Sequence, residues 1–250
     1  MASVVERSDQ YANFLVAPLP AGQGVCQVCH GPANQGFRTC WRCGRAAQQL
    51  GTGAADAVVP ISLAPKHGQY ANELWRYKNT QGHQRQYFQT GLTAVLWRFL
   101  ALHEACVAEH CTVPGFDVVT IVPSTSGRSV HPLRDMVAEI SGVTRRRYRD
   151  LLTPTQNAQA LGREASPARY SSGALENGEA VLLIDDTWTT GGHAQSAAAA
   201  LKAAGAGRVA VVVLGRHLNG TYGDTAAHIE QARMRRYDWK VCVLRDGPHG

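Results

Sequence analysis

The sequence has no apolar run approaching the roughly 20 residues that a membrane-spanning helix requires. Its first residues, MASVVERSDQYANF, carry early acidic side chains and no apolar core, so they do not resemble a secretion signal. We therefore expect a cytoplasmic protein that is not inserted in a membrane and whose cysteines stay reduced. A hydrophobic content of 44% with 18% charged residues indicates an ordinary globular chain rather than a disordered one.

Lysine is scarce: among 25 basic residues the only lysines are Lys66, Lys78, Lys202 and Lys240, and none of them follows a glycine. The sequence therefore lacks the G-x4-G-K-[ST] phosphate loop, which excludes a P-loop ATPase despite the strand-like VLLIDD. It also lacks the G-x-G-x-x-G of a dinucleotide site after an early strand. The net charge of +6, mostly from arginine, fits a phosphorylated small ligand or a nucleic acid as partner. A solvated arginine surface explains that charge equally well.

Hydrophobic periodicity predicts helices that alternate with strands. Apolar residues at three- and four-residue steps predict a long helix, and β-branched runs bounded by breakers predict buried strands. The expected helices span 88–106, 130–141, 193–204 and 224–236, and the expected strands span 117–123, 180–185, 208–215 and 239–244. This alternation predicts an α/β fold with a parallel sheet covered by helices on both faces.

The first 60 residues differ in composition from the rest. They are rich in Gly, Ala, Gln and Pro, and the stretch GTGAADAVVP (51–60) is typical of a linker. We therefore predict an N-terminal region over 1–60 and a larger domain over 61–250. Residues 144–173 show no regular period and are interpreted as either a mobile active-site loop or a surface excursion.

Two cysteine pairs, CQVC (26–29) and CWRC (40–43), lie ten residues apart. This spacing predicts a closed structural zinc site with Cys26, Cys29, Cys40 and Cys43 as thiolate ligands. Disulfides are opposed by the expected reducing compartment, and a redox C-x-x-C pair does not explain two copies. The other three cysteines, Cys106, Cys111 and Cys242, are isolated in sequence and are interpreted as small core residues.

The stretch LLIDDTWTTGGHA (182–194) joins a predicted strand to a predicted helix. Ligands of open parallel sheets bind beyond the carboxyl ends of the strands, where Asp185 and Asp186 stand. The following loop leads into a helix N-terminus, which attracts anions, and Gly191 and Gly192 let the backbone approach a phosphate. The two carboxylates repel phosphate but suit sugar hydroxyls, with Mg²⁺ nearby to offset charge. A ribose 5-phosphate has both kinds of group: hydroxyls for the carboxylates and a phosphate for the loop and the helix N-terminus.

This stretch resembles the 5-phosphoribosyl 1-pyrophosphate (PRPP) signature of type I phosphoribosyltransferases. Together with the four-cysteine ribbon, with Lys78 in LWRYKN and with the IVPSTSGR stretch, it makes the chain similar to the ComF family, phosphoribosyltransferase-like proteins associated with DNA uptake (competence) in bacteria. The resemblance covers most of the chain. It implies a type I phosphoribosyltransferase-like parallel sheet with a small N-terminal zinc ribbon.

The resemblance also implies roles for individual residues. Asp185 and Asp186 would be the catalytic pair that holds the ribose 2′- and 3′-hydroxyls. PRPP would further contact Ser124 and Arg128 at its pyrophosphate, and its 5′-phosphate would lie among Thr189, Thr190, Gly191, Gly192 and His193. Thr187 would also contact PRPP. The implied activity is that of a glycosyltransferase, in which Mg²⁺–PRPP passes its phosphoribosyl group to a nitrogen nucleophile and releases pyrophosphate.

Three features depart from the family pattern. His193 stands where the signature usually closes with Thr, Trp188 is large for its place, and SGRSVHPLRDM differs from the usual RGFNQ stretch. His193 can donate to a phosphate, more strongly when protonated. The departures favour an alternative: a non-catalytic PRPP-fold accessory or regulator of DNA uptake that binds single-stranded DNA or competence-machinery proteins.

In that alternative an arginine cluster would track the DNA phosphates and Tyr148 would stack on a base. The cluster consists of Arg145, Arg146, Arg147 and Arg149. A solvated arginine face is the simpler interpretation of the same residues. A homo-oligomer is compatible with either function.

Overall fold

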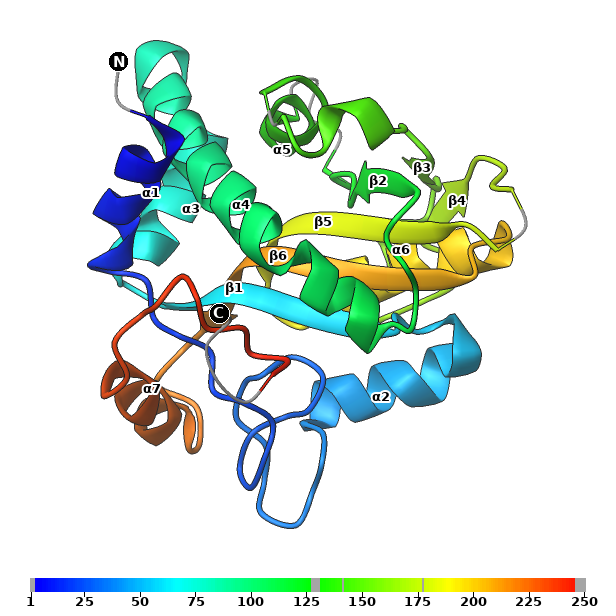
Figure 1. The fold of residues 1–250 in the computed structure, drawn as a ribbon. Helices are drawn as coiled ribbons and strands as arrows, with labels where there is room; N and C mark the ends of the chain where they lie inside the picture. The colour runs from blue at the N-terminus through cyan, green and yellow to red at the C-terminus, as the bar shows by residue number, and fades with distance from the viewer. Residues whose placement is uncertain (1–2, 127–130, 141, 177, 246–250) are drawn as a thin grey trace.

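The four-stranded main sheet of this protein is parallel throughout and has the strand order β1-β6-β5-β2 (Figure 1). The structure, a computed structural model, describes residues 3–126, 131–140, 142–176 and 178–245. The four strands are β1 (Ala57–Pro65), β6 (Arg208–Leu218), β5 (Ala180–Trp188) and β2 (Val118–Ile121). Each neighbouring pair runs parallel, so the predicted fold class, α/β with a parallel sheet flanked by helices, is confirmed.

Helices cover both faces of the sheet (Figure 1). One face carries α1 (Val4–Ala12), α3 (Gln69–Asn79) and α4 (Gly82–His110). The other face carries α2 (Trp41–Leu50) and α6 (Gly192–Ala203). The remaining helical segments are α5 (Pro132–Arg134), η1 (Gly51–Gly53), η2 (Asp135–Ile140, a π-helix), η3 (Arg145–Arg147) and α7 (Thr225–Arg233).

The central strands supply alternate residues to two separate cores. In β5, Leu182 and Ile184 pack with α4, whereas Val181 and Leu183 pack with α6. All four side chains are 0% exposed. A strand buried on both faces is an uninterrupted apolar run, which is why the sequence of β5 shows no polar alternation before Asp185.

Most predicted elements are confirmed, although their observed boundaries differ from the predicted ones. The helix expected at 88–106 is the longer α4, and the helices expected at 193–204 and 224–236 correspond to α6 and α7. Of the helix expected at 130–141, the described part is α5 followed by η2. The strands expected at 117–123, 180–185 and 208–215 are β2, β5 and β6.

Two predictions about elements are wrong. Residues 57–60 are not linker: they form the first half of β1, where Ala57 pairs with Ala210 and Pro60 with Val213. The division into 1–60 and 61–250 stays a prediction, and β1 runs across it. Residues 239–244 form turns rather than a strand, with Asp238 accepting a hydrogen bond from the Lys240 amide.

Among the described residues, α4 is long and apolar enough by length and composition to cross a membrane. However, 67% of its most apolar window is buried against the rest of the chain. A buried core helix passes the same test, so this helix is weak evidence for a membrane span.

The irregular segment 144–173 is an ordered excursion. Its strands β3 (Leu152–Pro154) and β4 (Tyr170–Ser172) pair antiparallel. Between them the buried guanidinium of Arg169 donates to the carbonyls of Ala158, Leu161, Gly162 and Glu164. One side chain therefore fixes the course of the turn that joins the two strands.

The packing of α1 on α4 predicts the effect of Gly91→Ala. An alanine in a helix interior normally stabilises by about 1 kcal/mol relative to glycine. Here a Cβ at position 91 would overlap the Tyr11 hydroxyl and crowd its ring. We expect a net destabilisation of about 1–3 kcal/mol in urea unfolding. Gly115→Ala is the control, because nothing lies within 4 Å of its Cβ position. An equal free energy of unfolding for the two variants would contradict the close packing of Tyr11 against Gly91.

Candidate functional site

A cavity of about 400 Å³ lies at the carboxyl ends of β5 and β2. Every described residue that the sequence analysis assigned to PRPP lines it: Ser124, Asp185, Asp186, Thr187, Thr189, Thr190, Gly191, Gly192 and His193. Arg128 lies outside the described residues. The structure thus brings the first loop, after β2, and the second loop, after β5, to one site, and adds side chains from α3.

The two aspartates at the end of β5 differ in charge state. The Lys78 ammonium forms an ion pair with the Asp186 carboxylate, which also accepts a hydrogen bond from the Tyr77 hydroxyl. Burial opposes ionisation of Asp186, but Lys78 outweighs it and the net pKa is lowered. For Asp185, burial and the neighbouring Asp186 charge raise the pKa to about 7. Near neutral pH, Asp186 is therefore ionised while Asp185 is close to its titration midpoint.

The second loop bends at Gly191, whose φ is 80°. Trp188 is 2% exposed and its indole lies against this glycine, so that any Cβ at position 191 would overlap the ring. The indole packs into the core on the α6 face and does not line the cavity. The large residue at position 188 therefore supports the loop from behind.

The loop ends at the N-terminus of α6, which Gly191 caps without a side-chain hydrogen bond. The first amides of a helix have no carbonyl partner within the helix and attract anions. At Gly192 the absence of a side chain lets the backbone of Arg163 and Glu164 approach closely. The Thr190 hydroxyl donates to the Arg163 carbonyl over 2.9 Å, and the Arg163 residue itself lines the cavity.

His193 lies in the first turn of α6 and contacts β4. Its Nδ1 is 2.9 Å from the hydroxyl of Tyr170, which donates to the Pro123 carbonyl. Burial and the nearby Arg169 lower the pKa of His193 to about 4. The imidazole is therefore neutral near pH 7, and protonation does not strengthen any phosphate contact there.

Several cavity residues were not predicted from the sequence. Tyr77 lies beside Lys78, which the resemblance had noted, and Arg163 comes from the turn that Arg169 holds. His131 accepts a hydrogen bond from the Ser124 amide over 2.8 Å, and burial lowers its pKa. The neutral imidazole of His131 thus holds the first loop in place. The composition of the stretch around it gave no signal for this role.

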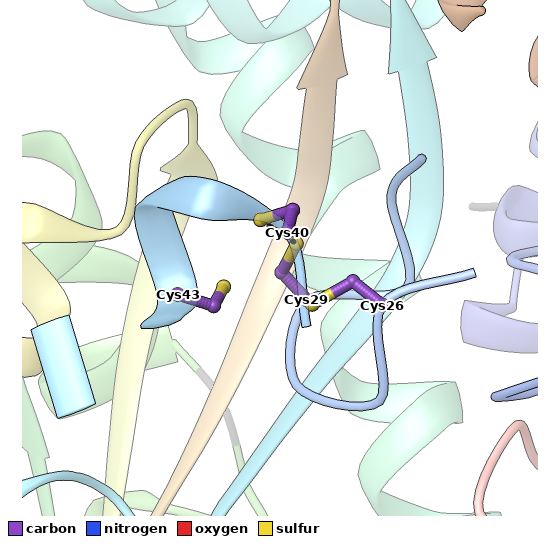
Figure 2. A group of neighbouring side chains, drawn as sticks. All are labelled: Cys26, Cys29, Cys40 and Cys43. Atoms are coloured by element: carbon purple, nitrogen blue, oxygen red, sulfur yellow. Dashed lines mark hydrogen bonds between the residues drawn. The ribbon is translucent and has the colours of Figure 1, made fainter. Parts of the chain in front are cut away.

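The four N-terminal cysteines form one cluster in which all sulfur atoms lie within 4.8 Å of one another (Figure 2). Cys26 and Cys29 come from a tight turn, Cys43 from α2, and Cys40 from the position that caps α2 (Figure 2). Three of the four are buried. Four converging thiols are the donor set of structural zinc, and a closed shell leaves no position for substrate.

A buried arginine joins the cysteine cluster to the second loop. Nη1 of Arg216 donates to the carbonyls of Trp188, Thr189 and His217, at 3.2, 2.8 and 2.7 Å. Burial lowers the pKa of Arg216, but the neighbouring Cys29 raises it and the net shift is upward. The guanidinium therefore stays charged between the thiols and the loop.

The arginine cluster at 145–149 is largely engaged within the chain. Arg147 forms a two-pronged ion pair with Glu104, and Arg149 pairs with Glu179. The Tyr148 hydroxyl donates to Asp150 over 2.9 Å, and its ring packs against the core on the α4 face. Of the four arginines, Arg145 and Arg146 are exposed, whereas Arg147 and Arg149 are half-buried.

The raised pKa of Asp185 predicts a pH-dependent stability. Its ordinary value is 3.8, so between about pH 4 and 7 the folded chain holds this proton more tightly than the unfolded chain does. The stabilisation is complete below pH 4 and is lost as pH rises through 7. We expect the free energy of unfolding of the wild type, minus that of Asp185→Asn, to fall by ~1 kcal/mol or more from pH 4 to 8. A difference that rises or stays flat with pH contradicts this assignment.

The cysteine cluster predicts a metal stoichiometry. Cys26→Ser combined with Cys29→Ser should lower the zinc content of the purified protein by about one ion per chain. Mass-spectrometric metal analysis checks this, with Cys111→Ser as the control for loss of a buried thiol outside the cluster. Unchanged zinc in the double variant would exclude the cluster as the zinc site.

Comparison with protein-family models, with curated proteins and with solved structures finds no match to this chain.

Proposed function

We propose that this protein binds Mg²⁺–PRPP in the cavity at the end of β5 and transfers its phosphoribosyl group to a nitrogen nucleophile. One observation carries the proposal: two adjacent carboxylates and a glycine-threonine loop at a helix N-terminus line the same cavity. The resemblance to type I phosphoribosyltransferases, and to the ComF family through the four-cysteine cluster, agrees with it. A volume of about 400 Å³ is within the range of small-molecule sites.

The 5′-phosphate of the ligand would occupy the N-terminus of α6. Gly191 and Gly192 line the cavity there, and Thr189 adds a hydroxyl. A neutral His193 leaves the helix amides as the main donors. This arrangement holds a phosphate without a lysine in the loop.

The ribose would lie against the carboxylates. Asp185 and Asp186 accept hydrogen bonds from the 2′- and 3′-hydroxyls, and Lys78 keeps Asp186 ionised for that purpose. Mg²⁺ enters with PRPP as part of the substrate, and the oxygen donors of this end of the cavity are of the type it prefers.

In the reaction the bond between C1 and the pyrophosphate oxygen breaks, and a bond forms between C1 and the nitrogen of the acceptor. Pyrophosphate leaves with the electron pair, and the acceptor nitrogen loses one proton to solvent or base. The chain contributes by stabilising the departing charge rather than by a nucleophile of its own. Arg163 and Ser124, which line the cavity, would contact the departing pyrophosphate.

The proposal predicts that Asp185→Asn with Asp186→Asn abolishes stabilisation by PRPP. In the wild type, Mg²⁺–PRPP at about 100 times its dissociation constant should add about 2.7 kcal/mol to the free energy of unfolding. The double variant should show no shift in melting temperature with PRPP, because it cannot accept both ribose hydroxyls.

A matched control replaces two carboxylates elsewhere in the chain: Asp9→Asn with Asp150→Asn. Both residues are exposed and lie outside the cavity. The control should keep the wild-type shift. A full shift in the Asp185/Asp186 variant would remove the ribose role. Pyrophosphate release against a panel of bases and amines then tests for turnover.

The rival function, a non-catalytic DNA-uptake accessory that binds single-stranded DNA or competence proteins, makes a different prediction. Exposed Arg145 and Arg146 favour it. If it holds, Arg145→Ala with Arg146→Ala should weaken oligonucleotide binding and flatten its dependence on salt. The PRPP response should be unaffected. Absence of any salt-dependent oligonucleotide binding by the wild type contradicts the rival.

A further inference from the structure

A second group of soft ligands lies apart from the four-cysteine cluster. His103, Cys106 and Cys242 are all buried, and their ligand atoms lie within 4.8 Å of one another. The first two come from consecutive turns of α4, and Cys242 comes from the C-terminal turns at 239–244. Two of the three cysteines that look isolated in the sequence, Cys106 and Cys242, therefore meet at one histidine.

The histidine is oriented as a metal ligand would be. His103 Nε2 lies 2.7 Å from the Trp239 carbonyl, which can only accept, so this nitrogen carries the ring proton. Nδ1 then presents its lone pair on the side of the thiols and lies 4.0 Å from the sulfur of Cys106. Metal-bound histidines usually donate their other ring N–H to a carbonyl or carboxylate in this way.

We propose that His103, Cys106 and Cys242 form a metal site for one soft d¹⁰ cation, Zn²⁺ or Cu⁺. Thiolate sulfur and imidazole nitrogen suit such ions, and this group contains no carboxylate of the kind that Mg²⁺ or Ca²⁺ prefers. Two thiolates and a neutral imidazole would carry two negative charges, which Zn²⁺ would balance in full and Cu⁺ by half. The site uses none of the residues of the proposed phosphoribosyl chemistry.

The site would link two parts of the chain. Cys242 lines a cavity of about 100 Å³ that it shares with Arg235 and Tyr237. An ion bound there would join α4 to the C-terminal turns. Those turns already contact α4, through Trp239 against the Arg98 guanidinium and through the ion pair of Arg245 with Glu109.

The test compares variants of the full chain by metal content. Reduced protein is loaded with Zn²⁺ or with Cu⁺ in separate arms, desalted against a weak chelator, and measured for metal per chain. The wild type should hold about two ions, one in the four-cysteine cluster and one here. Cys242→Ser should hold about one. Each arm is then desalted against a stronger chelator, and the arm in which the second ion stays bound identifies the cation.

Two further variants make the result decisive. His103→Gln keeps an amide donor for the Trp239 carbonyl but lacks the metal-binding nitrogen, and it should also lose one ion while its circular dichroism stays that of the wild type. Cys111→Ser removes a buried thiol at the end of α4 outside the group and should keep both ions. Equal metal content in the wild type, Cys242→Ser and His103→Gln overturns the proposal. A Cys106–Cys242 disulfide that persists after treatment with reductant overturns it as well.

Discussion

The packing of the cysteine cluster against the candidate site depends on one buried arginine charge. Arg216 is 8% exposed, and a buried cation is costly unless charge and hydrogen bonds compensate it on every side. The compensation comes from two places: the Cys29 sulfur in the cysteine cluster and the carbonyls of Trp188 and Thr189 in the second loop. Gly31 brings the backbone of the cysteine turn against the guanidinium, because a Cβ there would lie 2.9 Å from Nη2. The cysteine cluster therefore supports the candidate site directly and is part of the same packed unit.

Buried or half-buried cations organise the other walls of the cavity by the same principle. Arg169 gathers four carbonyls of one turn and so presents Arg163 and Glu164 to the N-terminus of α6. Lys78 neutralises Asp186 from α3. The two arginines donate hydrogen bonds to backbone carbonyls that have no partner in regular secondary structure, whereas Lys78 balances a buried carboxylate. This explains how a site made of irregular segments can be fixed in place, and why arginines that look like surface charge in the sequence are structural.

The sequence analysis correctly predicted the elements whose pattern lies within one contiguous segment of the chain. The apolar runs of β2, β5 and β6 and the periodicity of α4 need only their own residues to be recognised, as does the change from strand to helix at 182–194. Strand β1 was missed because Pro60 and Pro65 argue against a strand; an edge strand tolerates proline, and β1 is the edge of this sheet. Tyr77, Tyr170 and Arg216 could not be assigned, since their partners are distant in sequence and only the sheet order brings them together. The pairing of Cys106 with Cys242 was missed for the same reason.

The charges around the cavity restrict what it can hold. A simple anion would meet the partly ionised Asp185 beside the Lys78–Asp186 ion pair, and the charge of Asp185 would oppose it. A bare metal ion would have to displace Lys78 and would approach Arg163 and the positive end of α6. Both costs would be smaller for a ligand whose hydroxyl groups face the carboxylates while its phosphate faces the helix. The phosphorylated sugar of the proposed function would present its groups in this way.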